Sequence, residues 1–284
     1  MDPVVDVVVV TYGGGEFLPD CIAAVRAQGA IVKRVLVVDN ASPDDTAARA
    51  EAIDSVEVVR NATNVGYAAA MNQAFARTDA PYLLSLNADC VLGDGYLDAC
   101  VAALEADAAL AAVTGVLRLA DGRIDSTGIT LDAAYRARDR DRHAQQPSRG
   151  EPFGVSGAAA TWRRSALDAV GPKPWWDWLF VYWDDVELAW RLRDHGWRFA
   201  CVVAASATHR RGSDTADPEF IEAQSLRNRL ATIARHQGRA GLLRPRAAAF
   251  TAFTLGRLAL RHPQALRRAA PLQAVRAGLS QHVQ

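Results

Sequence analysis

The stretch that best indicates the fold is Val35-Leu36-Val37-Val38-Asp39-Asn40-Ala41-Ser42. Its first four residues are apolar, and polar residues follow them. Such a run predicts a buried β-strand with Asp39 at its end, where a carboxylate can accept hydrogen bonds from a nucleotide base or ribose. Asn40 and Ser42 are more typical of a turn and a helix cap. Similar apolar runs alternate with alanine-rich helical segments through the first half of the chain. This alternation predicts an α/β fold with a mostly parallel sheet flanked by helices.

A second strand-like run, residues 83–86, is followed by Asn87 and Asp89. Ligands of open α/β sheets bind beyond the carboxyl ends of the strands, so Asp89 is a candidate for contact with a ligand. A hard divalent cation there would take oxygen ligands from a carboxylate and from phosphates. The alternative is a turn carboxylate without a function.

A candidate phosphate loop lies between residues 61 and 72. Gly66 allows a backbone to approach closely or to turn sharply. The alanine-rich run that follows predicts a helix whose first N–H groups could face an anion. Asn64 could equally be the N-cap of that helix.

An aromatic run, residues 180–183, leads directly into Asp184 and Asp185 at the start of a predicted helix. Burying unpaired carboxylates costs several kcal/mol, so stability alone is a poor reason for this pair. The pair is better interpreted as a catalytic site in which one carboxylate removes a proton and its neighbour tunes or orients it. The alternative is a helix start with Asp184 as N-cap and Asp185 favoured by the helix dipole.

His209 follows a strand-like run at residues 200–205 and precedes a Gly-Ser pair. It is a candidate metal ligand, although a lone histidine at a strand end is often structural. The tryptophans Trp175, Trp176, Trp178 and Trp183 come just before the paired carboxylates. They could pack in the core or form a lip that binds an acceptor, because aromatic side chains bury large areas in either setting.

In this order the motifs resemble inverting family 2 glycosyltransferases, which use nucleotide-sugars and have the GT-A fold. The similarity covers roughly residues 4–235 and is greatest to the bacterial rhamnosyl- and galactofuranosyltransferase branch. The matching segments are residues 7–12, 38–42, 64–66 with Asn72, 87–89, 184–185 and 209–213, together with 125–128 and 225–229. The resemblance implies a GT-A-type, Rossmann-like sheet that is mixed but mostly parallel and flanked by helices. The arginine-rich sequence after it predicts a basic helical extension at the C-terminus.

The resemblance also assigns roles to individual residues. Asp185 would be the general base with Asp184 beside it, Asp89 and His209 would bind Mg²⁺ or Mn²⁺, and Trp176 and Trp183 would contact the acceptor. Asn87 replaces the first carboxylate of the family's Asp-x-Asp motif, so it can offer only an amide. The donor-binding residues would be Thr11, Tyr12, Asp39, Asn64, Gly66, Asn72, Asn87 and Asp89.

The implied activity is that of a metal-dependent inverting glycosyltransferase of the hexosyltransferase type. It would move a sugar, rhamnose or a similar one, from a nucleoside-diphosphate sugar to a hydroxyl of a glycan or lipid-linked acceptor in bacterial cell-surface polysaccharide synthesis. A non-catalytic nucleotide- or glycan-binding module is the main alternative and would not need Asp185. A sugar-phosphate nucleotidyltransferase would carry Arg and Lys in a glycine-rich loop after the first strand, and residues 11–17 have neither. A dinucleotide-binding Rossmann domain would need G-x-G-x-x-G spacing, which residues 13–15 lack.

The net charge is zero, but the two signs are segregated. Residues 220–284 hold 11 arginines, no lysine and one acidic residue, which gives about +10, so the rest of the chain carries about −10. We therefore divide the chain into a catalytic domain, residues 1–235, and a basic amphipathic tail, residues 236–284. The tail could bind an anionic membrane surface or pack on the catalytic domain. Nucleic acid is not an expected partner, because basic and aromatic residues are not interleaved.

The four cysteines show no metal-type pairing, which suits a reducing compartment. The start of the chain lacks the basic flank of a signal peptide, and no apolar run reaches membrane-spanning length. The expected location is therefore the cytoplasm, with the tail as a means of peripheral binding at the inner face of the plasma membrane. Residues 135–152 are polar and mixed in charge, which predicts a flexible loop that could lie near the active site.

Overall fold

The computed structural model describes residues 4–212 and 216–282, and Ser213 of the last motif lies outside them. The strands are β1 (Val5–Thr11), β2 (Val32–Asp39), β3 (Glu57–Arg60), β4 (Tyr82–Leu86), β5 (Cys90–Leu92), β6 (Leu110–Arg118), β7 (Ile124–Ser126), β8 (Ile129–Leu131), β9 (Ala137–Asp139), β10 (Ala159–Arg163) and β11 (Arg198–His209). Among the described residues, nine of them form one sheet in the order β3-β2-β1-β4-β10-β6-β11-β5, with β7 paired to β6. β8 and β9 form a separate hairpin.

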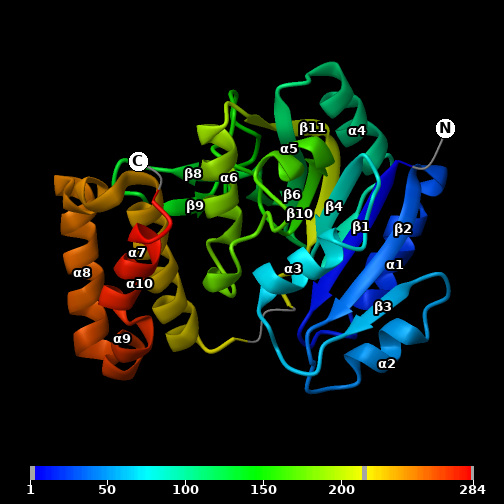
Figure 1. Cartoon of the computed structure of the whole chain (residues 1–284). Helices are drawn as coiled ribbons and strands as arrows, with labels where there is room; N and C mark the ends of the chain where they lie inside the picture. Colours follow the sequence, from blue (N-terminus) through cyan, green and yellow to red (C-terminus); the bar gives the residue numbers. More distant parts are fainter. Residues whose placement is uncertain (1–3, 213–215, 283–284) are drawn as a thin grey trace.

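The sheet is mixed, and most of its strands share one direction (Figure 1). β1 pairs in parallel with β2 and β4, β2 with β3, and β6 with β11. β10 is antiparallel to both β4 and β6, so β6 and β11 run in the same direction as the first four strands. β5 and β7 run in the opposite direction. The predicted mixed, mostly parallel α/β sheet is therefore confirmed.

Helices cover both faces of the sheet. The helices are α1 (Leu18–Arg26), α2 (Thr46–Glu51), α3 (Tyr67–Phe75), α4 (Tyr96–Ala106), α5 (Arg164–Ala169), α6 (Asp184–Asp194), α7 (Pro218–Leu243), α8 (Pro245–Arg261), α9 (Pro263–Ala269) and α10 (Pro271–Leu279). α1 and α4 pack on the face to which Val7 and Val9 point, while α3, α5 and α6 pack on the opposite face with Val8. Because alternate residues of β1 are buried on opposite faces, the strand is apolar except for Asp6 and Thr11, which are also buried.

The last four helices pack together beside α6 (Figure 1), around a cluster that includes Leu226, Leu230 and Leu258. α7 is kinked at Gly238, whose φ of 58° is a left-handed conformation that glycine adopts without strain. The proposed boundary after residue 235 falls inside α7. No helix in the described part of the chain is both long and apolar enough to cross a bilayer.

Residues 135–152 are more structured than the loop expected from their composition. They contain β9, and the buried guanidinium of Arg140 donates to the carbonyls of Ser148 and Arg149 at 2.8 Å each. Asp139 at the end of β9 lines the cavity described below, so the segment does lie beside the candidate site.

Candidate functional site

A cavity of about 860 Å³ opens beyond the carboxyl ends of β1 and β4. The end of β1, the turn after β4 and the start of α6 form three of its walls. The predicted site residues that line it are Thr11, Tyr12, Asn64, Gly66, Asn87, Asp89, Trp183, Asp184, Asp185 and His209. Motifs that are far apart in the chain therefore meet in one chamber.

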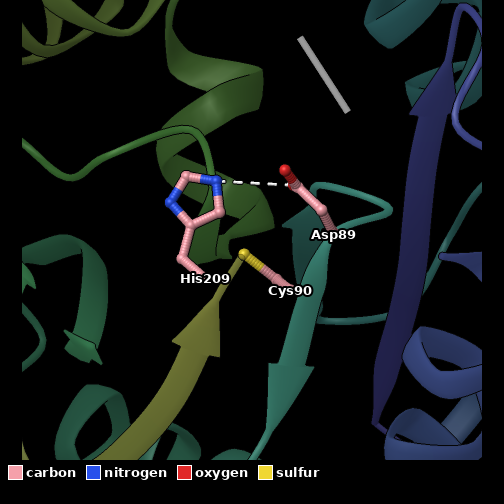
Figure 2. Close-up of side chains that lie close together, drawn as sticks. All are labelled: Asp89, Cys90 and His209. Carbon is pink, nitrogen blue, oxygen red and sulfur yellow. Dashed lines mark ion pairs between the residues drawn. The ribbon is translucent and has the colours of Figure 1, made fainter. Parts of the chain in front are cut away.

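Asp89 and His209 face each other because their strands are paired. His209 ends β11 opposite Cys90, the residue after Asp89, in the antiparallel β11–β5 pair. His209 Nε2 lies 3.4 Å from Asp89 Oδ1 (Figure 2), and the other carboxylate oxygen accepts the N–H of Gly212 at 2.8 Å. Both side chains are buried.

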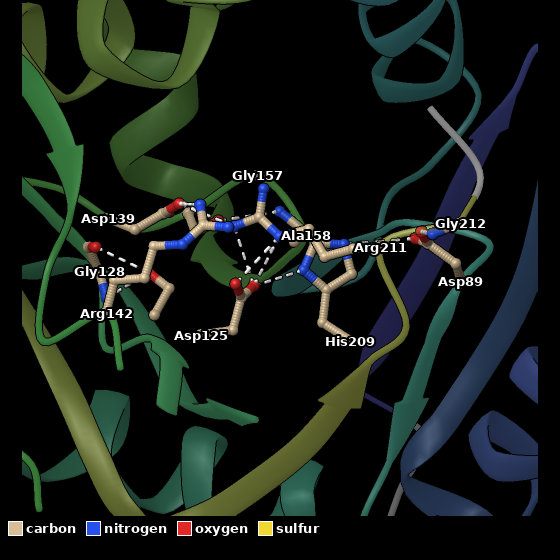
Figure 3. Close-up of polar contacts among 12 residues, drawn as sticks. Asp89, Asp125, Gly128, Asp139, Arg142, Gly157, Ala158, His209, Arg211 and Gly212 are labelled. Atoms are coloured by element: carbon tan, nitrogen blue, oxygen red, sulfur yellow. Dashed lines mark hydrogen bonds and ion pairs between the residues drawn. The ribbon is translucent and has the colours of Figure 1, made fainter. Parts of the chain in front are cut away.

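Asp125 is the buried partner of His209 on the other side of the ring (Figure 3). Its Oδ2 lies 2.7 Å from His209 Nδ1, and Arg211 Nε donates to both of its oxygens at 3.0 Å. Burial opposes ionisation of Asp125, but the hydrogen bonds from His209 and Arg211 outweigh it and hold the pKa of Asp125 below its ordinary value. Because an ionised carboxylate only accepts, Nδ1 carries a hydrogen, and Nε2 is the nitrogen that remains to bind a proton or a metal ion beside Asp89.

This donor set fits a divalent cation. A nitrogen lone pair and a carboxylate oxygen face each other, so either a proton or a metal ion between them satisfies both. Burial lowers the pKa of His209, but its hydrogen bonds to Asp125 and Asp89 outweigh that effect and raise it. A histidine whose second nitrogen donates to a carboxylate is the usual arrangement of a metal ligand. Cys90 is close enough to join a metal cluster, but burial raises the pKa of its thiol well above the ordinary value, which disfavours the ligating thiolate.

Asp184 and Asp185 begin α6 at the cavity wall. Asp184 is not the N-cap that the alternative interpretation of this pair predicted. The N-cap is Trp183, and Asp184 is the first residue of the helix. Asp185 Oδ1 accepts the N–H of Val186 at 2.8 Å, and its Oδ2 accepts that of Gly157 at 3.4 Å. Asp184 is buried, whereas Asp185 is half-buried. Asp185 is thus the more accessible of the two carboxylates to a molecule in the cavity.

The pKa of both carboxyl groups is raised, and burial is the largest cause for each. The charge of Asp185 raises the pKa of Asp184 further, because two close carboxylates resist being ionised together. A carboxyl group with a raised pKa is a stronger base once it is ionised. The pair therefore has the electrostatics expected of a general base and its neighbour.

Position 66 has to be a glycine because Phe180 packs directly against its backbone. Gly66 has a φ of 87°, and a Cβ there would lie 2.5 Å from Phe180 Cδ2. Asn64 Oδ1 accepts the N–H of Gly66 at 2.9 Å and the side-chain amide of Asn40 at 2.8 Å. The N-cap of α3 is Gly66 rather than Asn64.

Three predicted site residues do not line the cavity. Asp39 is buried at the end of β2, where Oδ2 accepts the N–H of Ser42 at 3.3 Å and Oδ1 has no hydrogen-bond partner among the described residues. Asn72 is tied to the chain before α6: its amide donates to the carbonyl of Trp175 and to Asp177, and its oxygen accepts the N–H of Trp175. Trp176 stacks on Trp178, with ring centroids 5.4 Å apart. The structure thus gives Asn72 and Trp176 packing contacts outside the cavity.

Several charged residues of the site were not assigned a role from the sequence. Asp125 belongs to the 125–128 motif and Arg211 follows His209 by two positions, so both had a signal in the sequence. Asp139 receives an ion pair from Arg211 at 2.7 Å and lines the cavity. Arg268, from α9, also lines the cavity, and no local pattern pointed to it.

Residues 6–171 match the model of the glycosyl transferase family 2. The chain is 27% identical over 243 residues to an N-acetylglucosaminyl-diphospho-decaprenol L-rhamnosyltransferase of Mycobacterium tuberculosis, an alignment that covers 76% of this chain and 78% of the relative.

Among solved structures, the fold is similar to three glycosyltransferases. GalNAc-T7 with UDP, GalNAc and Mn²⁺ has a TM-score of 0.65 at 13% identity, and the match covers 88% of this chain but about half (53%) of that one. The mannosyltransferase PcManGT of Pyrobaculum calidifontis with GDP-Man and Mn²⁺ has a TM-score of 0.59 at 20% identity, covering 100% and 77%. TarS of S. aureus with UDP has a TM-score of 0.57 at 16% identity, covering 98% and 83%. By its family match and its GT-A fold, this chain belongs to the family 2 glycosyltransferases.

Proposed function

We propose that this enzyme transfers a sugar, rhamnose or a similar one, from a nucleoside-diphosphate sugar to a hydroxyl of a lipid-linked glycan acceptor, with inversion at the anomeric carbon. The observation that carries the proposal is that one cavity holds both the Asp89–His209 pair and the Asp184–Asp185 pair. The first pair suits the diphosphate of a donor and the second suits proton removal from an acceptor. The 27% identical relative supports the sugar and the acceptor class, since its name specifies rhamnose and a diphospho-decaprenol carrier.

The donor would lie along the end of β1 and the turn after β4. Thr11, Tyr12, Asn64 and Asn87 would contact its nucleoside and sugar. Asp39 precedes Asn40 of this wall, and its Oδ1, which has no hydrogen-bond partner in the described part of the chain, suits an N–H donor such as that of a nucleotide base. Mn²⁺ or Mg²⁺ is the proposed cofactor, held by Asp89 and His209, and when bound it offsets the negative charge that grows on the leaving diphosphate.

The electrostatics of the cavity support a need for a cation. Its wall carries the carboxyl groups of Asp89, Asp139, Asp185 and Asp217, together with Asp184, whose pKa of about 8 keeps it largely protonated at neutral pH. A diphosphate that enters such a chamber is repelled unless positive charge accompanies it. Arg211 already makes ion pairs with Asp125 and Asp139, so it is not free to neutralise a diphosphate alone.

Asp185 would act as the general base. Its carboxylate would accept the proton of the acceptor hydroxyl while that oxygen forms a bond to the anomeric carbon and the bond from this carbon to the diphosphate oxygen breaks. The proton ends on Asp185 and the electron pair leaves with the diphosphate. A single displacement by one nucleophile inverts the anomeric centre. The charge of Asp185 helps to raise the pKa of Asp184 to about 8, so Asp184 would stay protonated beside the ionised base.

The acceptor would enter from the wall formed by the C-terminal helices. Phe220 and Ile221 of α7 give this wall an apolar surface and Arg268 of α9 adds a positive charge, while Trp183, before α6, lines the same cavity. Among the described residues Arg268 makes no ion pair, in contrast to Arg257, which pairs with Glu222 at 3.2 Å. An exposed guanidinium beside an apolar wall suits a phosphate group attached to a sugar.

We further propose that α8 brings the enzyme to an anionic membrane at the inner face of the plasma membrane. Phe253 and Leu260 on this helix are 65% and 88% exposed, and Leu272 on α10 is 77% exposed. Arg246 and Arg261 lie at the two ends of α8. A helix with exposed apolar residues between arginines is typical of a segment that lies in a membrane interface.

A transfer assay tests the proposed reaction. Purified protein would be given Mn²⁺ and a panel of nucleotide-sugars that differ in base and sugar, with an acceptor glycan presented either on a lipid diphosphate or as a simple glycoside. We expect transfer from one donor, only to the diphosphate acceptor, and loss of transfer in excess chelator. Asp89→Ala should abolish the response to Mn²⁺, and His209→Ala should weaken it. Full activity in chelator would contradict the metal site, and binding of nucleotide without transfer to any acceptor would favour the non-catalytic binding module.

Co-sedimentation with vesicles tests the membrane proposal. The double variant Phe253→Ser/Leu260→Ser should lose binding to anionic vesicles, and wild-type binding should weaken with salt, because each basic residue near such a surface contributes about 1 kcal/mol. Val203→Ser is the matched control, since Val203 is 66% exposed on β11. Truncation is unsuitable, because α10 and α9 pack on α7. Equal binding by the double variant and the control would contradict the proposal.

A further inference from the structure

The turn that delivers the paired carboxylates to the cavity has an unusual backbone. Phe180, Tyr182 and Trp183 have φ values of 65°, 64° and 67°, and none of them is glycine. Left-handed conformations are unfavourable for such side chains and persist only where the surroundings hold them. Because Trp183 is directly followed by Asp184 and Asp185, the conformation of this turn sets where both carboxylates point.

One side chain from α7 holds most of the turn. Asn228 is fully buried, and the two N–H groups of its Nδ2 are shared among three carbonyls, those of Leu179 at 2.8 Å, Val181 at 2.9 Å and Tyr182 at 2.7 Å. Its Oδ1 accepts from Arg227 at 3.1 Å. A side-chain amide is suited to this place, because a carboxylate would repel the three carbonyl oxygens.

The other side of the turn packs on Gly66 and the start of α3. The carbonyl of Phe180 accepts the N–H of Ala68 at 3.1 Å, and Gly66 gives the space that Phe180 occupies. The turn is thus held between α3 and α7. Gln224, one helical turn before Asn228, adds a hydrogen bond to the carbonyl of Leu179 at 2.7 Å, ahead of the left-handed residues.

We infer that Asn228 is a positioning residue of the transfer reaction: it keeps the turn at residues 179–183 in its left-handed form and so aims Asp185 at the acceptor hydroxyl. This inference rests on the proposed role of Asp185 as the base. Asn228 itself does not line the cavity. Its loss should therefore reduce the rate of the chemical step and leave binding of the donor unchanged.

The test variants are Asn228→Asp, which keeps the size but removes the N–H donors, and Asn228→Ser, which keeps one donor. We expect kcat to fall about 100-fold in Asn228→Asp, since misplacement of a catalytic group by about 1 Å can cost that much, while the KM of the donor changes less than about twofold. Asn228→Ser should recover part of the rate. Gln224→Met is the matched control, because it removes one hydrogen bond from the same turn before the left-handed residues.

Hydrogen–deuterium exchange gives a readout that does not need turnover. In Asn228→Asp the amides of residues 180–186 and Ala68 should exchange faster, while those of β1 and β4 keep their protection. A wild-type kcat in Asn228→Asp, or a loss of donor affinity and of protection throughout the protein in both Asn228 variants, would overturn the inference. Failure of the wild-type protein to transfer any sugar would contradict the proposed function instead, and unchanged exchange of residues 180–186 in the variants would then still overturn the role of Asn228.

Discussion

His209 is oriented by Asp125: its Nδ1 lies 2.7 Å from Asp125 Oδ2, and this contact directs Nε2 toward Asp89. Loss of a partner of this kind typically weakens metal affinity about 10–100-fold. We expect Asp125→Asn to raise the Mn²⁺ concentration for half-maximal activity by that factor, because an amide can donate to Nδ1 and so favour the wrong tautomer. Direct titration with Mn²⁺ by calorimetry should show the same loss.

The control for this variant is Asp121→Asn, on the exposed turn before β7. It removes one negative charge from the same region without touching His209. An equal change in Mn²⁺ affinity in the two variants would assign the effect to net charge, and no change in Asp125→Asn would refute the orienting role.

Asp184 should lower the stability of the enzyme at neutral pH. Its pKa is raised by burial and by Asp185, so the folded state binds the proton more tightly than the unfolded chain. The stability from this group is present below the ordinary pKa of 3.8 and is lost as pH rises through the raised pKa. At pH 8, Asp184→Asn should therefore have a free energy of unfolding higher than that of the wild type by about 1 kcal/mol or more, since each unit of pKa shift corresponds to about 1.4 kcal/mol. Urea unfolding measures this difference. The difference should narrow as pH falls, and a variant less stable than wild type at pH 8 would contradict this account.

Glu187 joins α6 to α7 through buried ion pairs. It is fully buried and lies 2.7 Å from Arg191 Nη2 and 3.1 Å from Arg235 Nη1. Burial raises the pKa of Glu187, but these arginines and His236 outweigh it and lower the pKa to about 2. Its stabilising effect is therefore present above the ordinary pKa of 4.5 and is lost as pH falls toward 2.

Glu187→Gln should destabilise the protein by about 3–5 kcal/mol at pH 7, because it leaves buried arginine charges unpaired. Urea unfolding measures the loss. Asp107→Asn is the control, since Asp107 pairs with Arg198 on the surface, where such pairs contribute less than about 1 kcal/mol. Equal losses in the two variants would show that the Glu187 pairs have no special role.

The pH dependence of transfer follows from the raised pKa of Asp185. The base must be ionised to accept a proton, so kcat/KM should be low when Asp185 is protonated and should rise with pH through its raised pKa, above the ordinary value of 3.8. A pH–rate profile between pH 4 and 9 measures this. A rate that stays flat across that range would exclude a carboxylate base with a raised pKa.

The sequence predicted the fold and most of the cavity because these depend on local patterns. Asp39 and Asp89 end or follow apolar strands, and the ends of parallel strands meet at one edge of a sheet. Asp184 and Asp185 could be recognised as candidates because burying carboxylates among apolar residues lowers stability, which makes a functional role a better explanation of the pair.

The contacts between distant segments could not be read from local patterns. Asn72 looked like a donor ligand, but it bonds to Trp175, 103 residues away, and nothing near Asn72 in the chain specifies that partner. Trp176 and Trp183 both come shortly before the paired carboxylates, yet only Trp183 lines the cavity, whereas Trp176 stacks on Trp178. Arg268 joins the site through the packing of α9, which composition alone does not determine.

The central claim is that Asp185 removes the proton of the acceptor hydroxyl. The most direct measurement compares Asp185→Asn with the wild type in two experiments on the same protein: the rate of sugar transfer, and the affinity for the intact nucleotide-sugar by calorimetry with Mn²⁺. The amide has nearly the same size but cannot take the proton, so we predict that transfer falls at least about 10²–10⁴-fold while donor affinity changes little. Near-normal transfer by Asp185→Asn would contradict the account, and so would a loss of transfer that is fully explained by lost donor binding.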